Sequence, residues 1–264
     1  MNEGPVSSLH PHRFIAFGGA CLLASTLVAC STLWGFEDPA SNVEVDGGGA
    51  DDAGSPDLGP RPMSCAEALS KRQLVQDGPI TIDPDGAGPV RPFEVFCRGV
   101  GTDSGPLEYL SLPRSFETGN AAVNVSIATG GAACKCGDMT TSFSKVRLRV
   151  SDLTVLVHDG AFAKISGDTA CSEACWGNVG PLWPHAFGMA TACTYTGPPG
   201  RASIDLQGTP FAISDKAVFV MVGWTPSGNI EYANERQTAV VTGNGYCGGF
   251  GPTDPPGEIP LAQR

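Results

Sequence analysis

Short runs of alternating hydrophobic and polar residues dominate the chain from about residue 75 onward. In the clearest run, residues 145–150 (KVRLRV), the apolar side chains share one face of a strand and the basic side chains share the other. A Ser-Asp pair then precedes a second apolar run at 153–157, and the two runs predict a β-hairpin. Further strand patterns occur at 93–96, 107–112, 123–128, 202–206, 211–214, 217–222 and 239–242, mostly separated by Gly or Pro.

Helical periodicity is confined to one short segment. Ser64 followed three residues later by Glu67 is a capping-box pattern, which predicts a helix over 65–73. The whole chain has 16 % charged residues and is rich in Gly (35) and Pro (22), a composition typical of turn-rich β proteins. We therefore expect one disulfide-braced domain over 61–264, mainly β with a short N-terminal helix and about ten short strands.

The N-terminal hydrophobic run has a different character. Residues 14–29 are mostly apolar, follow Arg13 and end in Leu-Val-Ala before Cys30, the order of a secretory signal peptide. A membrane-spanning helix is the alternative, but the run is shorter than the roughly 20 residues that a bilayer core requires. The residues 27–30 (LVAC) resemble the lipobox of bacterial lipoproteins, which implies cleavage after residue 29 and lipidation of Cys30. Ser31 in place of Asp favours the outer membrane of the cell envelope over the inner membrane, by analogy with that family.

Residues 30–60 predict an acidic tether between the lipidated cysteine and the domain. The segment 31–60 has seven acidic residues and no Lys or Arg, and such a composition favours disorder. The whole chain has a formal net charge of −11 and no cluster of Lys and Arg, which argues against nucleic acid as a partner.

Eight cysteines follow the tether. In an exported domain an even number indicates a disulfide framework, with 105 possible pairings for eight cysteines. Zinc binding is the alternative, since the Cys171–Cys175 spacing suits a ligand pair whereas the Cys134–Cys136 spacing does not. The cysteines are Cys65, Cys97, Cys134, Cys136, Cys171, Cys175, Cys193 and Cys247.

Several of these segments resemble a known extracellular domain. Residues 64–67 (SCAE), 76–82, 95–97, 108–112, 134–136, 143–148, 159–163, 200–209 and 246–249 follow the order and approximate spacing of the GON domain. The GON domain closes certain ADAMTS secreted metalloproteases of animals. The N-terminal part of this domain also resembles fibrinogen-type domains, and that resemblance implies a disulfide between Cys65 and Cys97. Other pairings remain open, including one between Cys171 and Cys175, because the cysteine pattern departs from that of the family after residue 136.

No enzyme motif accompanies this resemblance. The zinc-binding His-Glu-x-x-His helix of ADAMTS enzymes lies in another domain, and this chain has no such motif. His158 and Asp159 follow a strand and are a weak general-base candidate, and His185 is expected to lie in a loop. Residues 83–94 place carboxylates at positions 1, 3 and 12 of an EF-type calcium loop, but the prolines favour a simple turn between two strands.

The sequence therefore predicts an envelope lipoprotein with a non-catalytic GON-like module that binds an extracellular protein or glycan. The partners are the membrane, through the lipid anchor, and this unidentified ligand, and no cofactor is expected. The alternative is a zinc-binding, metalloendopeptidase-related protein, as the ADAMTS parents of the GON domain suggest.

Overall fold

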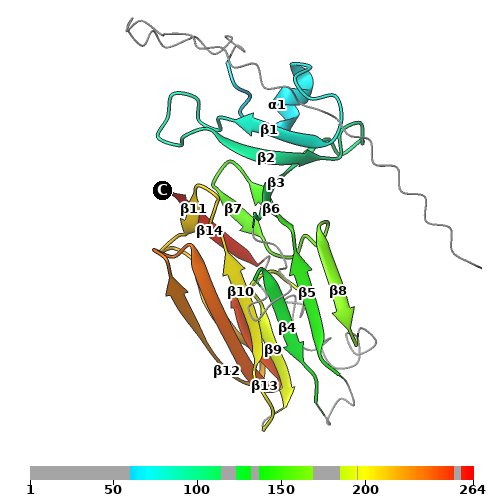
Figure 1. Cartoon of the computed structure of the whole chain (residues 1–264), viewed down its shortest axis with the longest axis vertical. Helices are drawn as coiled ribbons and strands as arrows, with labels where there is room; N and C mark the ends of the chain where they lie inside the picture. Colours follow the sequence, from blue (N-terminus) through cyan, green and yellow to red (C-terminus); the bar gives the residue numbers. More distant parts are fainter. Residues whose placement is uncertain (1–59, 114–122, 132–136, 169–184, 195, 253–256) are drawn as a thin grey trace, which may run out of the picture. The chain divides into compact units, whose positions relative to one another are not determined.

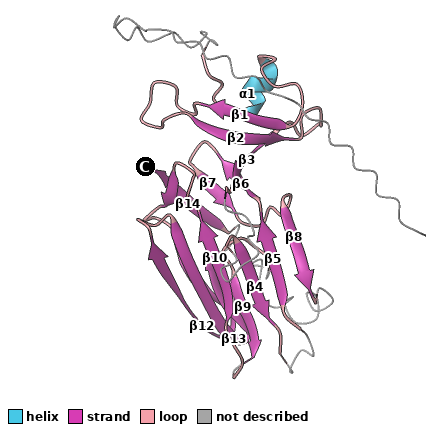
Figure 2. Ribbon diagram, viewed as in Figure 1, coloured by secondary structure: helices cyan, strands magenta, loops and turns pink. Residues whose placement is uncertain are grey.

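The structure is a computed structural model that describes residues 60–113, 123–131, 137–168, 185–194, 196–252 and 257–264. All of these residues belong to one compact unit, Gly54–Arg264. The described residues of this unit form one short helix and two sheets (Figures 1 and 2). The prediction of a mainly β fold is confirmed. Fourteen strands occur in the described part of the chain, so the expectation of about ten was too low.

The first sheet is antiparallel at every pairing and has the order β1-β2-β3-β6-β7-β14-β11. The predicted hairpin at 145–157 is confirmed as its β6–β7 pair. The strands are β1 (Gly78–Ile82), β2 (Phe93–Arg98), β3 (Leu107–Ser111), β6 (Lys145–Arg149), β7 (Thr154–Leu156), β14 (Glu258–Gln263) and β11 (Phe211–Ile213).

The second sheet contains the order β10-β13-β9-β4-β5-β8, with β12 paired to β13. An additional β10–β4 pairing closes β10, β13, β9 and β4 into a ring. Of the pairings between described strands, β4 with β9 is parallel and the others are antiparallel. The strands are β4 (Val125–Thr129), β5 (Met139–Phe143), β8 (Ala163–Gly167), β9 (Ala190–Thr194), β10 (Gly200–Asp205), β12 (Phe219–Ala233) and β13 (Thr238–Pro252).

The helix α1 (Cys65–Ser70) begins where the sequence predicts and ends three residues early. The Ser64 hydroxyl accepts a hydrogen bond from the Glu67 N–H, as in a capping box, but the Glu67 carboxylate accepts from the Met63 N–H instead of from Ser64. At the other end Arg72 adopts a φ of 59°, and the Gln73 N–H bonds to the Ala68 carbonyl. This is a Schellman motif with arginine at the position that glycine usually occupies, and it stops the helix.

One hydrophobic core lies against the inner face of the first sheet. Along β2 the side chains of Phe93, Val95 and Cys97 are buried while their neighbours are more exposed, as the alternation of a strand requires. Phe93 meets Phe211 of β11 edge to face, with ring centres 4.9 Å apart. The same cluster of buried side chains includes residues of α1, so the helix and both ends of the sheet share this core.

The long β12–β13 hairpin folds over on itself. Phe219 and Ile230 both pack against the small cluster of Ala190, Ala202 and Val241, although eleven residues of straight strand would separate them by roughly 36 Å. The β12–β13 register shifts between Val222 and Ser227, and the register of β13 with β9 shifts between Tyr246 and Gly248, which marks the bend. Close backbone approach requires glycine here, because a side chain at Gly243 would overlap the Ala190 carbonyl.

None of the described helices is long and apolar enough to cross a membrane. The predicted signal peptide at 1–29 and nearly all of the tether at 30–60 lie outside the described residues, and so does Cys30. The lipidation of Cys30 therefore stays a prediction.

Candidate binding surface

The outer face of the first sheet carries a row of large side chains across three neighbouring strands. Phe96 of β2 pairs with Tyr109 of β3, and Tyr109 pairs with Arg147 of β6. Since Val95 and Cys97 point into the core, Phe96 points outward, and its register partners share its face. The row thus brings together segments of chain that are about fifty residues apart in sequence.

A third ring completes this row from outside the sheet. Phe162 lies in the loop between β7 and β8 and meets Phe96 and Tyr109 edge to face, at ring-centre distances of 5.5 and 4.9 Å. Edge-to-face contact is a favoured arrangement of aromatic rings, because the positive edge of one ring meets the negative face of the other.

Basic side chains lie over these rings. The Lys145 ammonium nitrogen is 4.8 Å from the ring centre of Phe96 and 5.1 Å from that of Phe162. The guanidinium carbon of Arg98 is 5.3 Å from the ring centre of Phe162, and that of Arg147 is 5.6 Å from the ring centre of Tyr109. These are cation–π distances.

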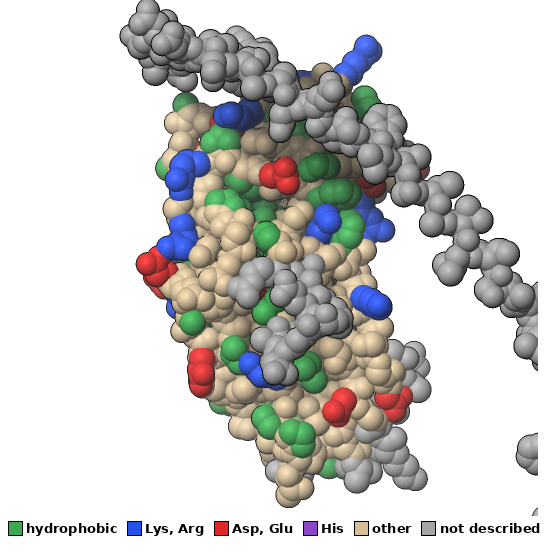
Figure 3. Space-filling view, viewed as in Figure 1, with side chains coloured by type: hydrophobic (Ala, Val, Ile, Leu, Met, Phe, Trp, Pro, Cys, Tyr) green, Lys and Arg blue, Asp and Glu red, His purple; other side chains and the backbone are tan. Residues whose placement is uncertain are grey.

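We name this set of six residues the aromatic–cation cluster: Phe96, Arg98, Tyr109, Lys145, Arg147 and Phe162. In the space-filling view, green hydrophobic and blue basic side chains adjoin in the region where Figure 1 labels β3 and β6 (Figure 3).

Asp159 fixes the loop that supplies Phe162. The Tyr109 hydroxyl donates to Oδ2 of Asp159 at 3.0 Å, and the Ala161 N–H donates to Oδ1 at 2.9 Å. Burial raises the pKa of Tyr109 above its usual value, and the hydrogen bond to Asp159 raises this pKa further. Tyr109 therefore stays neutral and holds Asp159, so the weak general-base interpretation of His158 and Asp159 gains no support from the geometry.

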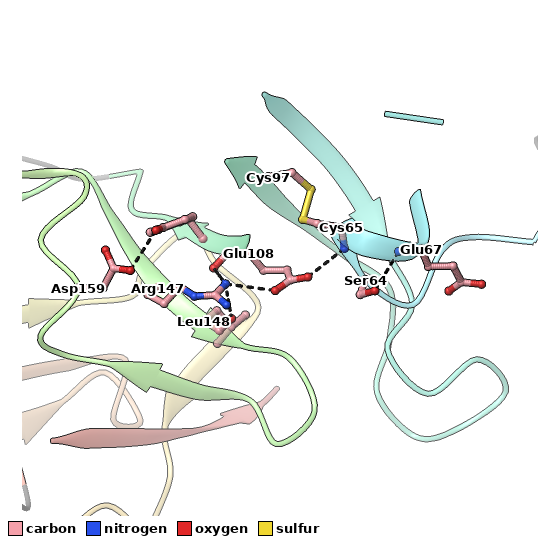
Figure 4. Close-up of polar contacts among 9 residues, drawn as sticks. Ser64, Cys65, Glu67, Cys97, Glu108, Arg147, Leu148 and Asp159 are labelled. Carbon is pink, nitrogen blue, oxygen red and sulfur yellow. Dashed lines mark hydrogen bonds and ion pairs between the residues drawn. A yellow bond between two sulfur atoms is a disulfide. The ribbon is translucent and has the colours of Figure 1, made fainter. Parts of the chain in front are cut away.

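A buried carboxylate ties the cluster to the helix. Glu108 is 7 % exposed, and its Oε1 accepts the Cys65 N–H at 3.0 Å. Its Oε2 lies 3.1 Å from Nη1 of Arg147, and this nitrogen also donates to the Glu108 carbonyl at 2.8 Å. Figure 4 shows Glu108 between Arg147 on one side and Cys65 on the other. The charge of Arg147 is thus compensated within the protein.

The other two cations have a different environment. Arg98 is exposed and Lys145 is half-buried, and neither forms an ion pair with any carboxylate among the described residues. Their N–H groups remain available to an anion from outside the chain.

The predicted disulfide framework is visible in part. Cys65 and Cys97 form a disulfide, with Cα atoms 5.7 Å apart, which is the pair that the resemblance implies. Cys193 is buried and disulfide-bonded. Cys247 lies in β13, but its side chain is outside the described residues, as are Cys134, Cys136, Cys171 and Cys175. The pairings of these five stay predictions.

The predicted turn at the calcium-like loop is confirmed, because β1 and β2 form an antiparallel pair around it. Asp85 stabilises the loop itself, since its Oδ2 accepts the Val90 N–H at 3.0 Å. No group of three or more His, Cys, Asp or Glu side chains suited to a metal ion occurs within the described residues. Burial lowers the pKa of His185, and electrostatic repulsion from the neighbouring imidazole of His158 lowers it further.

The comparisons agree with the resemblance that the sequence suggests. Most residues of the aromatic–cation cluster, together with Glu108 and Asp159, lie in four segments that resemble the GON domain. These segments are 95–97, 108–112, 143–148 and 159–163. Neither the curated proteins nor the solved structures contain a match to this chain. The family model of the GON domain matches residues 62–257, which is well over half of the sequence. The chain belongs to the GON domain family.

Proposed function

We propose that this protein is a cell-envelope lipoprotein that displays its GON domain as a non-catalytic module for extracellular binding or adhesion. The observation that carries this proposal is the aromatic–cation cluster. It is the outward face of a sheet whose inner face packs on the hydrophobic core, and its Arg98 and Lys145 form no ion pair with a carboxylate of the described residues. Such a surface suits recognition of an anionic partner.

The proposed cellular address rests on the sequence. Arg13, the apolar run at 14–29 and Cys30 support export and lipidation, and the acidic residues of 31–60 support a spacer between anchor and domain. A single acyl chain anchors weakly, whereas the two or three chains of a lipoprotein anchor stably. The proposed location is the outer membrane.

The zinc-binding, metalloendopeptidase-related alternative receives no positive support. Two of the eight domain cysteines, Cys65 and Cys97, form a disulfide with each other and are therefore not zinc ligands. The sequence has no His-Glu-x-x-His motif, which leaves the activity of the ADAMTS parents without its catalytic residues here.

Substitution Cys30→Ala tests the display of the domain. Cells that express the wild-type chain should carry it in the membrane fraction and should adhere to a surface coated with extracellular glycans or proteins. The C30A chain cannot be lipidated, so it should leave the membrane fraction, and adhesion should fall to that of cells without the protein. The control is purified C30A protein coupled to beads, which should still bind the coated surface.

Two outcomes would count against this proposal. If the C30A chain stayed in the membrane fraction, Cys30 would not be the anchor. If cells with and without the wild-type protein adhered equally, the adhesion role would be wrong.

A further inference from the structure

Resting on the proposed binding function, we propose that the aromatic–cation cluster binds an acidic polysaccharide. Arg98 and Lys145 would pair with carboxylate or sulfate groups of the polymer, and the sugar rings between these groups would lie against Phe96 and Phe162. This assignment names the ligand class and the residues that recognise it.

The two cations lie close enough together to bind one ligand. Arg98 and Lys145 both lie over the ring of Phe162, so they can be no farther apart than their two distances to its centre combined. One polymer segment can therefore reach both. The guanidinium of Arg98 offers paired N–H donors that match a carboxylate or sulfate, while Lys145 acts as a compact point charge.

The charges around Arg98 and Lys145 also favour an anionic ligand. Arg147 is compensated by Glu108, and the carboxylate of Asp159 accepts hydrogen bonds from Tyr109 and Ala161. Seven acidic residues of the chain lie in 31–60, so much of the net charge of −11 belongs to the tether and not to this surface. Within the described part of the chain no carboxylate forms an ion pair with Arg98 or Lys145, so an approaching anion meets two cations that are free to bind it.

The position of β2, β3 and β6 within the sheet favours a polysaccharide over an acidic peptide as the ligand. The strands β2, β3 and β6 each have a neighbouring strand on both sides, so none of them is a free edge of the sheet. A peptide laid across this face could not add to the sheet as a further strand, which is how peptides that bind sheets usually form their backbone hydrogen bonds. A sugar ring has no amide groups to satisfy, and its C–H groups suit an aromatic face.

Many weak contacts along one polymer are expected to give the overall affinity. Two solvent-accessible charge pairs give weak binding to one segment of polymer, and salt weakens them further. A polymer with repeated anionic groups would engage many anchored copies of the protein together, which raises the overall affinity without new contacts. Two available cations are too few for the many phosphate contacts that nucleic-acid binding requires.

The test is direct binding of the full mature chain to four probes. These are polygalacturonic acid, which carries carboxylates, dextran sulfate, which carries sulfates, neutral dextran, and poly-L-glutamate. We expect binding to at least one of the two acidic polysaccharides, with no binding to neutral dextran and a weaker signal for poly-L-glutamate. The preferred polymer identifies the anionic group. Affinity should fall as salt is raised.

Two charge-matched double variants make the test specific. The variant Arg98→Gln/Lys145→Gln should lose at least tenfold in affinity, while Lys164→Gln/Lys216→Gln removes the same charge from exposed positions outside the cluster and should retain affinity. Melting curves of both variants check that the fold is intact.

Equal losses in both variants, or unchanged affinity of the R98Q/K145Q variant, would overturn the assignment of the site. Tighter binding of poly-L-glutamate would overturn the ligand class in favour of an acidic protein. Adhesion of cells without binding of either acidic polysaccharide would overturn this inference while leaving the proposed binding function in place.

Discussion

Replacement of both Cys65 and Cys97 by alanine is expected to lower the free energy of unfolding by about 3 kcal/mol. The two residues are 32 positions apart, and their disulfide joins α1 to β2. Both side chains are completely buried. A bridge over a loop of this length removes many conformations from the unfolded chain, and its loss returns that entropy. The helix has only six residues, so it depends on tertiary contacts for its stability.

Urea unfolding in oxidising buffer measures this effect. Reduction of the wild-type protein is not an equivalent control, because it would also open the disulfide of Cys193. The appropriate control is a pair of single variants, Cys65→Ala and Cys97→Ala, and each should lose about as much stability as the double variant. An unfolding midpoint for the double variant equal to that of the wild type would show that the bridge does not constrain the domain.

Substitution Arg147→Met is expected to cost about 3 kcal/mol of unfolding free energy. It removes the ion-pair partner of Glu108 and leaves this carboxylate buried. Among the described residues, the Cys65 N–H is then the remaining hydrogen-bond donor to it. The side chains of Arg147 and Glu108 are only 15 % and 10 % exposed, so water compensates the lost pairing poorly. The Glu108 carbonyl also loses a hydrogen bond from Arg147.

A double-mutant cycle separates the ion pair from the rest of the side chain. The variant Glu108→Gln/Arg147→Met should be more stable than R147M alone, because glutamine is neutral and can still accept from the Cys65 N–H. Lys145→Met is the matched control, since Lys145 lies on the same strand and face but pairs with no described carboxylate, and it should cost less than about 1 kcal/mol. Equal losses for R147M and K145M would show that the Glu108 pair contributes little.

Alternation and turn residues were sufficient to predict much of the first sheet. The hairpin of β6 and β7 follows directly from the strict alternation of residues 145–150. The strands β5, β8, β9 and β14 were not predicted, and the composition or exposure of the first three explains why. In β5 three of five residues are Ser or Thr, β9 consists of Ala, Thr and Cys, and β8 is a largely exposed strand at the end of the sheet order.

Backbone conformation explains the other differences. The helix was expected to reach residue 73, but Arg72 takes a left-handed conformation that sequence patterns assign to glycine. The strands β12 and β13 were expected as short runs, yet each has fifteen residues, because register shifts and a bend let them continue. Such continuation depends on tertiary packing against Ala190 and Ala202, which no local pattern encodes.

The candidate site was only partly foreseeable. Alternation placed Lys145 and Arg147 on one face, but the sequence gives no sign that Phe162 and Asp159 return to this face. Their meeting with Phe96 follows from the register of three strands and from a loop conformation. The resemblance marked most of these segments without indicating that they converge.

The most direct test of the central claim is a native intact mass of the chain from residue 61 onward, exported to an oxidising compartment and measured without reductant. A disulfide-braced, non-catalytic module predicts a mass lower than that of the reduced chain by eight hydrogens, one for each of its eight cysteines, with no bound metal. A retained zinc ion together with unoxidised cysteines would contradict this account and would favour the metal-dependent alternative.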